Sequence, residues 1–141
     1  RTAGRLMAKG DDFRLRGRVA TGLGLAVSFT TADWARQGFI QLVGVDPYPG
    51  TLNLKITDAD SLAVWAALRA TPGHHLPAPD TNSCAARLYP VTLGRGVTGA
   101  IVLPEVPGYP ADQVEIIAGV HLRQALSPAD DDVIITTAAA N

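Results

Sequence analysis

Residues 47–56 read Pro47-Tyr48-Pro49-Gly50-Thr51-Leu52-Asn53-Leu54-Lys55-Ile56, a turn followed by a strand. The prolines fix φ and remove backbone donors, and a glycine follows them. This combination predicts a turn that interrupts regular secondary structure. The next six residues alternate strictly between polar and apolar, which predicts a half-buried strand. Its apolar face carries Leu52, Leu54 and Ile56, and its polar face carries Thr51, Asn53 and Lys55.

Short elements are predicted on both sides of this strand. Alternating or β-branched runs predict strands at residues 14–20, 27–29, 88–93, 98–103, 114–118 and 133–137. Helices are expected at residues 32–43, capped by Thr30 or Thr31, and from a cap at Asp58 or Asp60 to residue 68. A helical turn is expected at 121–126 and a loop at 71–82. Many short strands with few helices indicate a mostly β protein, a small closed barrel with short helical insertions.

The composition limits the class of protein. The chain has 141 residues, 47% of them hydrophobic, which fits one domain over residues 13–141 after a poorly ordered arm at 1–12. The net charge is -1, so we expect no binding to nucleic acid or to an anionic membrane. No apolar run reaches the ~18 residues that span a bilayer. The single cysteine, Cys84, favours a cytoplasmic location, and we expect a monomer.

Thr51 and Asn53 are the first candidates for chemistry. They lie two positions apart on one strand face, and their hydroxyl and amide oxygens are neutral hard ligands that suit Mg²⁺. Neither residue has charge to hold a bare ion, so nucleotide phosphates would have to supply it. The same pattern also fits a strand whose polar residues simply face solvent. The residues by themselves leave both interpretations open.

A wider set of motifs resembles the archaeal CTP-dependent riboflavin kinases. The segment 47–55 is similar to the central signature of that family, and Gly22-Leu23-Gly24 matches its glycine loop. Downstream, Gly99-Ala100-Ile101-Val102-Leu103-Pro104, Glu115-Ile116-Ile117-Ala118 and His121-Leu122-Arg123 follow at the spacing of the family. The resemblance covers residues 16–135. It implies a six-stranded cradle-loop barrel that uses Mg²⁺ and transfers the γ-phosphate of CTP to the 5′-hydroxyl of riboflavin, giving FMN.

The resemblance also implies roles for individual residues. Thr51 and Asn53 would hold the metal. Glu115 would contact the flavin and could act as the catalytic proton acceptor, with Pro107 and Tyr109 in the flavin-side loop. Nucleotide contacts would come from two segments, which contain Gly22, Leu23, Gly24, Leu25, Ala26 and Val27, and Val120, His121, Leu122 and Arg123.

Two segments depart from the family pattern. Leu25, Ala26 and Val27 replace the acidic, glycine and basic positions that usually continue the loop, and Pro107 stands where the family has a threonine. Tyr109 could compensate by stacking on the isoalloxazine ring, or could pack on the barrel rim. These departures keep two alternatives to the riboflavin kinase open: a non-catalytic flavin- or nucleotide-binding module, and a kinase of another small alcohol.

Overall fold

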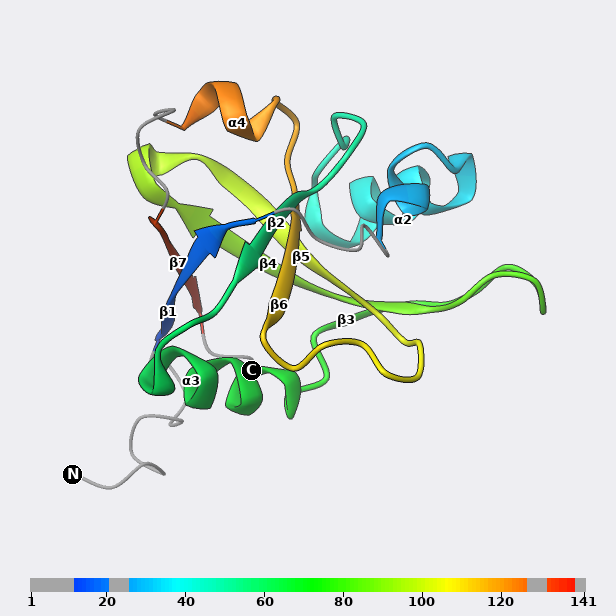
Figure 1. Cartoon of the computed structure of the whole chain (residues 1–141). Helices are drawn as coiled ribbons and strands as arrows, with labels where there is room; N and C mark the ends of the chain where they lie inside the picture. The colour runs from blue at the N-terminus through cyan, green and yellow to red at the C-terminus, as the bar shows by residue number, and fades with distance from the viewer. Residues whose placement is uncertain (1–11, 21–25, 127–131, 139–141) are drawn as a thin grey trace.

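The computed structural model describes residues 12–20, 26–126 and 132–138. Within these ranges the elements follow one another along the chain as strands with interspersed short helices (Figure 1). They are β1 (Asp12–Val19), η1 (Val27–Thr30), α2 (Asp33–Val43), β2 (Leu52–Lys55), α3 (Ala59–Arg69), β3 (His74–Leu76), β4 (Ala86–Leu93), η2 (Gly94–Gly96), β5 (Thr98–Pro104), β6 (Gln113–Ile117), α4 (Leu122–Ala125) and β7 (Asp132–Ala138).

Six of these strands form a closed antiparallel barrel. Their order is β4-β5-β6-β2-β1-β7, and the ring closes because β7 also pairs with β4. The short strand β3 pairs with β4 and extends the sheet outside the ring. Closure leaves few unpaired strand edges, which explains how such short strands form a stable sheet. The predicted mostly β class and six-stranded barrel are confirmed.

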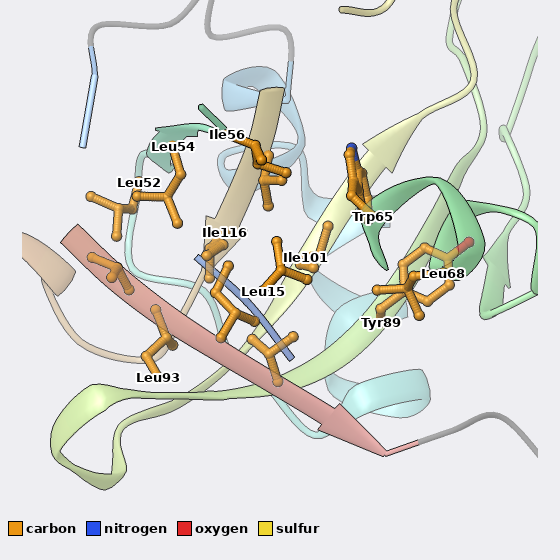
Figure 2. Close-up of a cluster of buried hydrophobic side chains, with 14 of the residues drawn as sticks. Leu15, Leu52, Leu54, Ile56, Trp65, Leu68, Tyr89, Leu93, Ile101 and Ile116 are labelled. Carbon is orange, nitrogen blue, oxygen red and sulfur yellow. The ribbon is translucent and has the colours of Figure 1, made fainter. Parts of the chain in front are cut away.

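The barrel interior is an apolar core. Figure 2 shows Leu15 of β1, Ile101 of β5 and Ile116 of β6 pointing toward one another, with Trp65 of α3 beside them. The predicted apolar face of β2 also points inward, and Leu52, Leu54 and Ile56 are all buried. The alternation along residues 51–56 therefore has a direct cause: one face of the strand fills the barrel.

A second core lies outside the barrel, under η1 and α2. Phe29 and Phe39 pack there against Leu88, Val102 and Ile117 on the outer face of β4, β5 and β6. Figure 1 shows α2 beside the barrel, with α3 and α4 near opposite ends. Strand β6 is consequently covered on both faces and all five of its residues are buried.

Three local predictions were wrong. Residues 27–29 form the 3₁₀ helix η1 rather than a strand, and β3 lies inside the predicted loop at 71–82. Helix α2 has Ala32 at its N-cap, without a side-chain cap. The Thr30 hydroxyl instead donates to the Val27 carbonyl at 2.7 Å and accepts from the Gly50 backbone N–H at 2.9 Å. Thr30 therefore connects η1 to the turn before β2.

The remaining elements match the sequence predictions closely, with ends that differ by one or two residues. The predicted arm at 1–12 lies almost wholly outside the described residues, so its order stays a prediction. Within the described ranges, the longest helices have 11 residues, and none is long and apolar enough to cross a membrane.

Helix α3 has the predicted aspartate cap. Asp58 accepts a hydrogen bond from the Ser61 backbone N–H at 2.8 Å, and this bond lowers the pKa of Asp58. Asp58→Ala is expected to lower the melting temperature by a few degrees at pH 7, measured by circular dichroism. Asp60→Ala, which removes a carboxylate from the same turn but no cap, serves as control.

The pH dependence of this effect follows from the direction of the pKa shift. The folded-state pKa of Asp58 lies below its unfolded value of 3.8, so the cap contributes its full stability above that pH. The contribution is lost as the pH falls through the folded-state pKa. The difference between wild type and Asp58→Ala should therefore narrow on acidification, and a difference that widened would contradict the assignment.

Candidate functional site

The turn before β2 is held in place from three sides. Arg36 of α2 binds Asp46 with two hydrogen bonds of 2.7 and 2.9 Å, which lower the pKa of that carboxyl. The Tyr48 N–H donates to the Ala118 carbonyl at 2.7 Å. Gly50, bonded to Thr30, has φ of 103°, a conformation that favours glycine. These contacts fix the direction in which β2 begins.

A buried carboxylate lies on the outer face of the neighbouring strand. Glu115 of β6 has 0% exposure, and three donors surround its oxygens. The Thr51 hydroxyl donates to Oε1 at 3.1 Å, and the Tyr109 hydroxyl donates to Oε2 at 2.8 Å. The Ala26 N–H donates to both oxygens, at 3.0 and 3.2 Å. Burying a carboxylate is costly unless it is hydrogen-bonded, and each of these three partners in the described part of the chain donates to Glu115.

Tyr109 is part of the packed structure. Its side chain is 8% exposed and belongs to the main apolar cluster, which matches the packing alternative of the two considered from the sequence. Burial, and next the charge of Glu115, raise the pKa of Tyr109 well above its ordinary value. The phenol therefore keeps its proton at neutral pH and stays a donor to Glu115.

Asn53 lies directly opposite Glu115 in the pairing of β2 with β6. Its Oδ1 atom is buried and has no hydrogen-bond partner among the residues that the structure describes. A buried acceptor without a partner costs about 1–3 kcal/mol, and a ligand bound at this oxygen would remove that cost. Thr51, two residues earlier, gives its single hydroxyl hydrogen to Glu115 and keeps its lone pairs as acceptors.

The pair fits a hard cation. Thr51 and Asn53 share a strand face and both have oxygens available as acceptors, the ligand chemistry of Mg²⁺. Over the described residues, no group of three or more His, Cys, Asp and Glu side chains is placed to hold a metal ion. The neutral oxygens of Thr51 and Asn53 are therefore the best candidate metal ligands among the residues that the structure describes.

A small hollow of about 70 Å³ adjoins Thr51. It is lined on one side by the turn and the start of β2, and on the other by the end of β6 and the segment that leads into α4. The Tyr48 ring meets the His121 ring edge-on, with centroids 5.2 Å apart. Tyr48 and Val120 are about half exposed at this hollow. The structure thus brings the predicted nucleotide segment at 120–122 beside Thr51.

Other predicted site residues are placed differently. Gly22, Leu23, Gly24 and Leu25 lie outside the described residues, as does the side chain of Arg123. Ala26 is fully buried and its N–H is bonded to Glu115. Val27 is exposed on η1, and Pro107 is exposed in the loop between β5 and β6.

Sequence reasoning missed two partners. It treated Thr30 as a possible helix cap and Tyr109 as a possible flavin contact, whereas both bond to parts of the site itself. No sequence signal marks these bonds, because one depends on the path of the loop before β6 and the other on how η1 packs beside the turn. A larger cavity of about 630 Å³, lined mainly by β4 and by residues 43–45 and 71–74, contains none of the predicted site residues.

The fold and the site together describe a small β-barrel protein with a hard-oxygen pair beside a rigid turn. The family model CTP-dep_RFKase, described as "Domain of unknown function DUF120", matches residues 19–137. The chain belongs to this family, and the resemblance found in its motifs is confirmed.

Curated relatives agree with the family match. The chain is 36% identical over 123 residues to a "Riboflavin kinase" of Methanocella arvoryzae, covering 87% of this chain and 56% of that protein. It is 31% identical to a "Riboflavin kinase" of Saccharolobus solfataricus, with 85% and 70% covered. It is 38% identical to a "Riboflavin kinase" of Aeropyrum pernix, with 84% and 89% covered. The chain thus spans little more than half of the first relative and most of the last.

Proposed function

We propose that this chain is a CTP-dependent riboflavin kinase, which transfers the γ-phosphoryl group of CTP to the ribityl 5′-hydroxyl of riboflavin. The bond from the γ-phosphorus to the β–γ bridging oxygen breaks and a bond to the 5′-oxygen forms, giving CDP, FMN and one proton. The structural observation that carries this proposal is the Asn53 Oδ1 beside Thr51, which is buried and has no partner among the described residues, as an oxygen awaiting a cation would. The family and the names of the relatives support the same reaction.

Thr51 and Asn53 would hold Mg²⁺ together with oxygens of the nucleotide. When bound, the cation supplies the positive charge that neutralises phosphate oxygens during transfer. The protein ligands are both uncharged, so their affinity for the bare cation should be low and should rise with CTP or CDP present. Binding of the cation would give the buried Asn53 oxygen, which has no partner among the described residues, an electrostatic partner, and this would stabilise the occupied site.

Nucleotide contacts are proposed for the two segments on either side of this pair. Val120, His121 and Leu122 line or adjoin the hollow next to the turn, and Arg123 would add positive charge. The loop that contains Gly22 and Gly24 would bring backbone N–H groups to phosphate, because glycine permits close approach. Phosphoryl transfer depends mainly on such positioning and on charge neutralisation.

The role of Glu115 as proton acceptor stays a prediction. Its carboxylate is fully buried and already bonded to three donors, so accepting the ribityl proton would require one of these bonds to open. Glu115→Gln tests the role directly: a proton acceptor predicts a loss of kcat, and undiminished turnover would remove the base assignment. Pro107, exposed in the flavin-side loop, is proposed only as a packing neighbour of the acceptor.

One observation favours a second candidate, a non-catalytic flavin- or nucleotide-binding module. In place of a more polar loop, this chain has a buried Ala26 whose N–H is committed to Glu115. That amide is not available to a phosphate in this arrangement.

A monomeric, cytoplasmic protein fits either function. The single cysteine argues only for a reducing compartment.

A turnover assay separates the two candidates. Purified protein is incubated with riboflavin and either CTP or ATP, with Mg²⁺ or with EDTA, and FMN is measured by chromatography with fluorescence detection. The kinase predicts FMN with CTP and Mg²⁺, and none with EDTA. Binding of CDP or riboflavin without FMN formation would support the binding module instead.

A further inference from the structure

We propose that Tyr109 and Glu115 are positioning residues for the cation site, and that the carboxylate of Glu115 orients the Thr51 hydroxyl so that its oxygen faces the cation as an acceptor. The proposal rests on the proposed cation–nucleotide site and adds two residues that act through Thr51. It gives Tyr109 a role in metal binding, distinct from any contact with flavin.

The first step concerns the single hydrogen of Thr51. A hydroxyl has one donor and two lone pairs, and its hydrogen rotates to the best available acceptor. In this structure the acceptor is Glu115 Oε1, 3.1 Å away. With the hydrogen directed to the carboxylate, the lone pairs are free for a cation. If an amide replaced the carboxylate, its NH₂ group could donate to Thr51 and occupy one of them.

The second step concerns the carboxylate itself. Tyr109 donates to Oε2 at 2.8 Å, the shortest bond to Glu115, and Ala26 bridges both oxygens. Donors on either side fix the plane of the group, so Oε1 stays aimed at Thr51. Because the phenol of Tyr109 is buried and held by packing, it provides a rigid stop for the carboxylate.

The third step concerns access. Glu115 has no exposed surface, so in this conformation it does not contact a bound ligand directly. It can influence the ligand only through the groups that are hydrogen-bonded to it. Asn53, opposite it in the strand register, presents the second acceptor oxygen to the same face. Partners that orient metal ligands in this way commonly change metal affinity by about 10–100-fold when mutated. Glu115 therefore orients the metal ligand Thr51, and Tyr109 orients Glu115.

Manganese titration tests this role without relying on turnover. Mn²⁺, which is paramagnetic, is titrated into protein saturated with CDP, and free Mn²⁺ is followed by electron paramagnetic resonance. Glu115→Gln is expected to weaken Mn²⁺ binding about 10–100-fold, and Tyr109→Phe about 3–10-fold, since Tyr109 acts one bond further away. Tyr89→Phe is the matched control: Tyr89 is also buried, and its hydroxyl donates to the Thr71 carbonyl at 2.9 Å, outside the site.

The double variant separates positioning from general loss of structure. If Tyr109 acts through Glu115, Tyr109→Phe should add little to the loss already caused by Glu115→Gln. Wild-type Mn²⁺ affinity in Tyr109→Phe and Glu115→Gln, or equal losses in Tyr109→Phe and Tyr89→Phe, would overturn the proposal. If Glu115→Gln did not fold, Tyr109→Phe against Tyr89→Phe would decide it. Failure of the wild-type protein to bind Mn²⁺ with CDP would instead overturn the proposed function.

Discussion

Asn53→Leu is expected to reduce Mg²⁺-dependent FMN formation by about 100-fold or more, because it removes one of two protein ligands for the cation. Leucine has nearly the shape of asparagine but no oxygen. The same substitution should leave the protein as stable as wild type, or more stable by about 1 kcal/mol, because the buried Asn53 Oδ1 bonds to no residue within the described ranges. Loss of activity with a gain of stability distinguishes a ligand from a structural residue.

Two measurements check this prediction. Initial rates of FMN formation give the activity, and urea denaturation gives the free energy of unfolding. Asn82→Leu makes the same chemical change at an exposed residue and should leave the rate unchanged. Undiminished turnover in Asn53→Leu would contradict the cation site, and a large loss of stability would mean that the asparagine amide has a structural partner.

Trp65→Ala is expected to destabilise the barrel by about 3–5 kcal/mol, the largest effect on stability that we predict. Trp65 has 0% exposure, belongs to the apolar core and meets the Tyr89 ring edge-on at 6.3 Å. Its removal leaves a large cavity where α3 packs on the strands. Its Nε1 has no hydrogen-bond partner in the described part of the chain, so we expect the loss to come from packing, and Trp65→Phe should keep most of the stability.

Trp34→Ala is the matched control for this change. Trp34 lies on α2, is only partly buried and packs edge-on against Phe29 at 5.7 Å. Urea denaturation should show a clearly smaller loss for Trp34→Ala than for Trp65→Ala. Equal losses would contradict this ranking and would mean that the outer layer under α2 contributes as much to the stability as the barrel interior.

Much of the fold was predictable because the apolar positions in the local sequence patterns are the positions that the folded protein buries. The alternation in residues 51–56 corresponds to a strand with one face in the barrel, and Asp58 caps α3 as expected. The prediction of a strand at 27–29 was wrong because that segment packs under α2 as a 3₁₀ helix, with Phe29 inward. Only Phe29 of these three residues is buried, and a segment this short cannot distinguish packing at one position from strand formation.

The site was predictable only in part. The spacing of Thr51 and Asn53 placed both on one face, and the structure keeps them there. The bonds from Thr51, Tyr109 and Ala26 to Glu115 span 64, 6 and 89 residues of sequence. The Thr51 and Ala26 contacts depend on which segments become neighbours in the fold, and the Tyr109 contact depends on the path of the loop before β6. Periodicity within one strand carries no information about any of them. The burial of the Asn53 oxygen could not be predicted from the sequence either, because it depends on the pairing of β2 with β6.

The most direct test of the central claim follows the transferred phosphate. CTP labelled with ³²P at the γ-position is incubated with riboflavin, Mg²⁺ and the protein, and the products are separated by chromatography. We predict label in FMN, at a rate that requires Mg²⁺ and falls about 100-fold or more in Asn53→Leu. Label that remained in CTP, or appeared only as inorganic phosphate, would contradict a riboflavin kinase built on the Thr51–Asn53 pair.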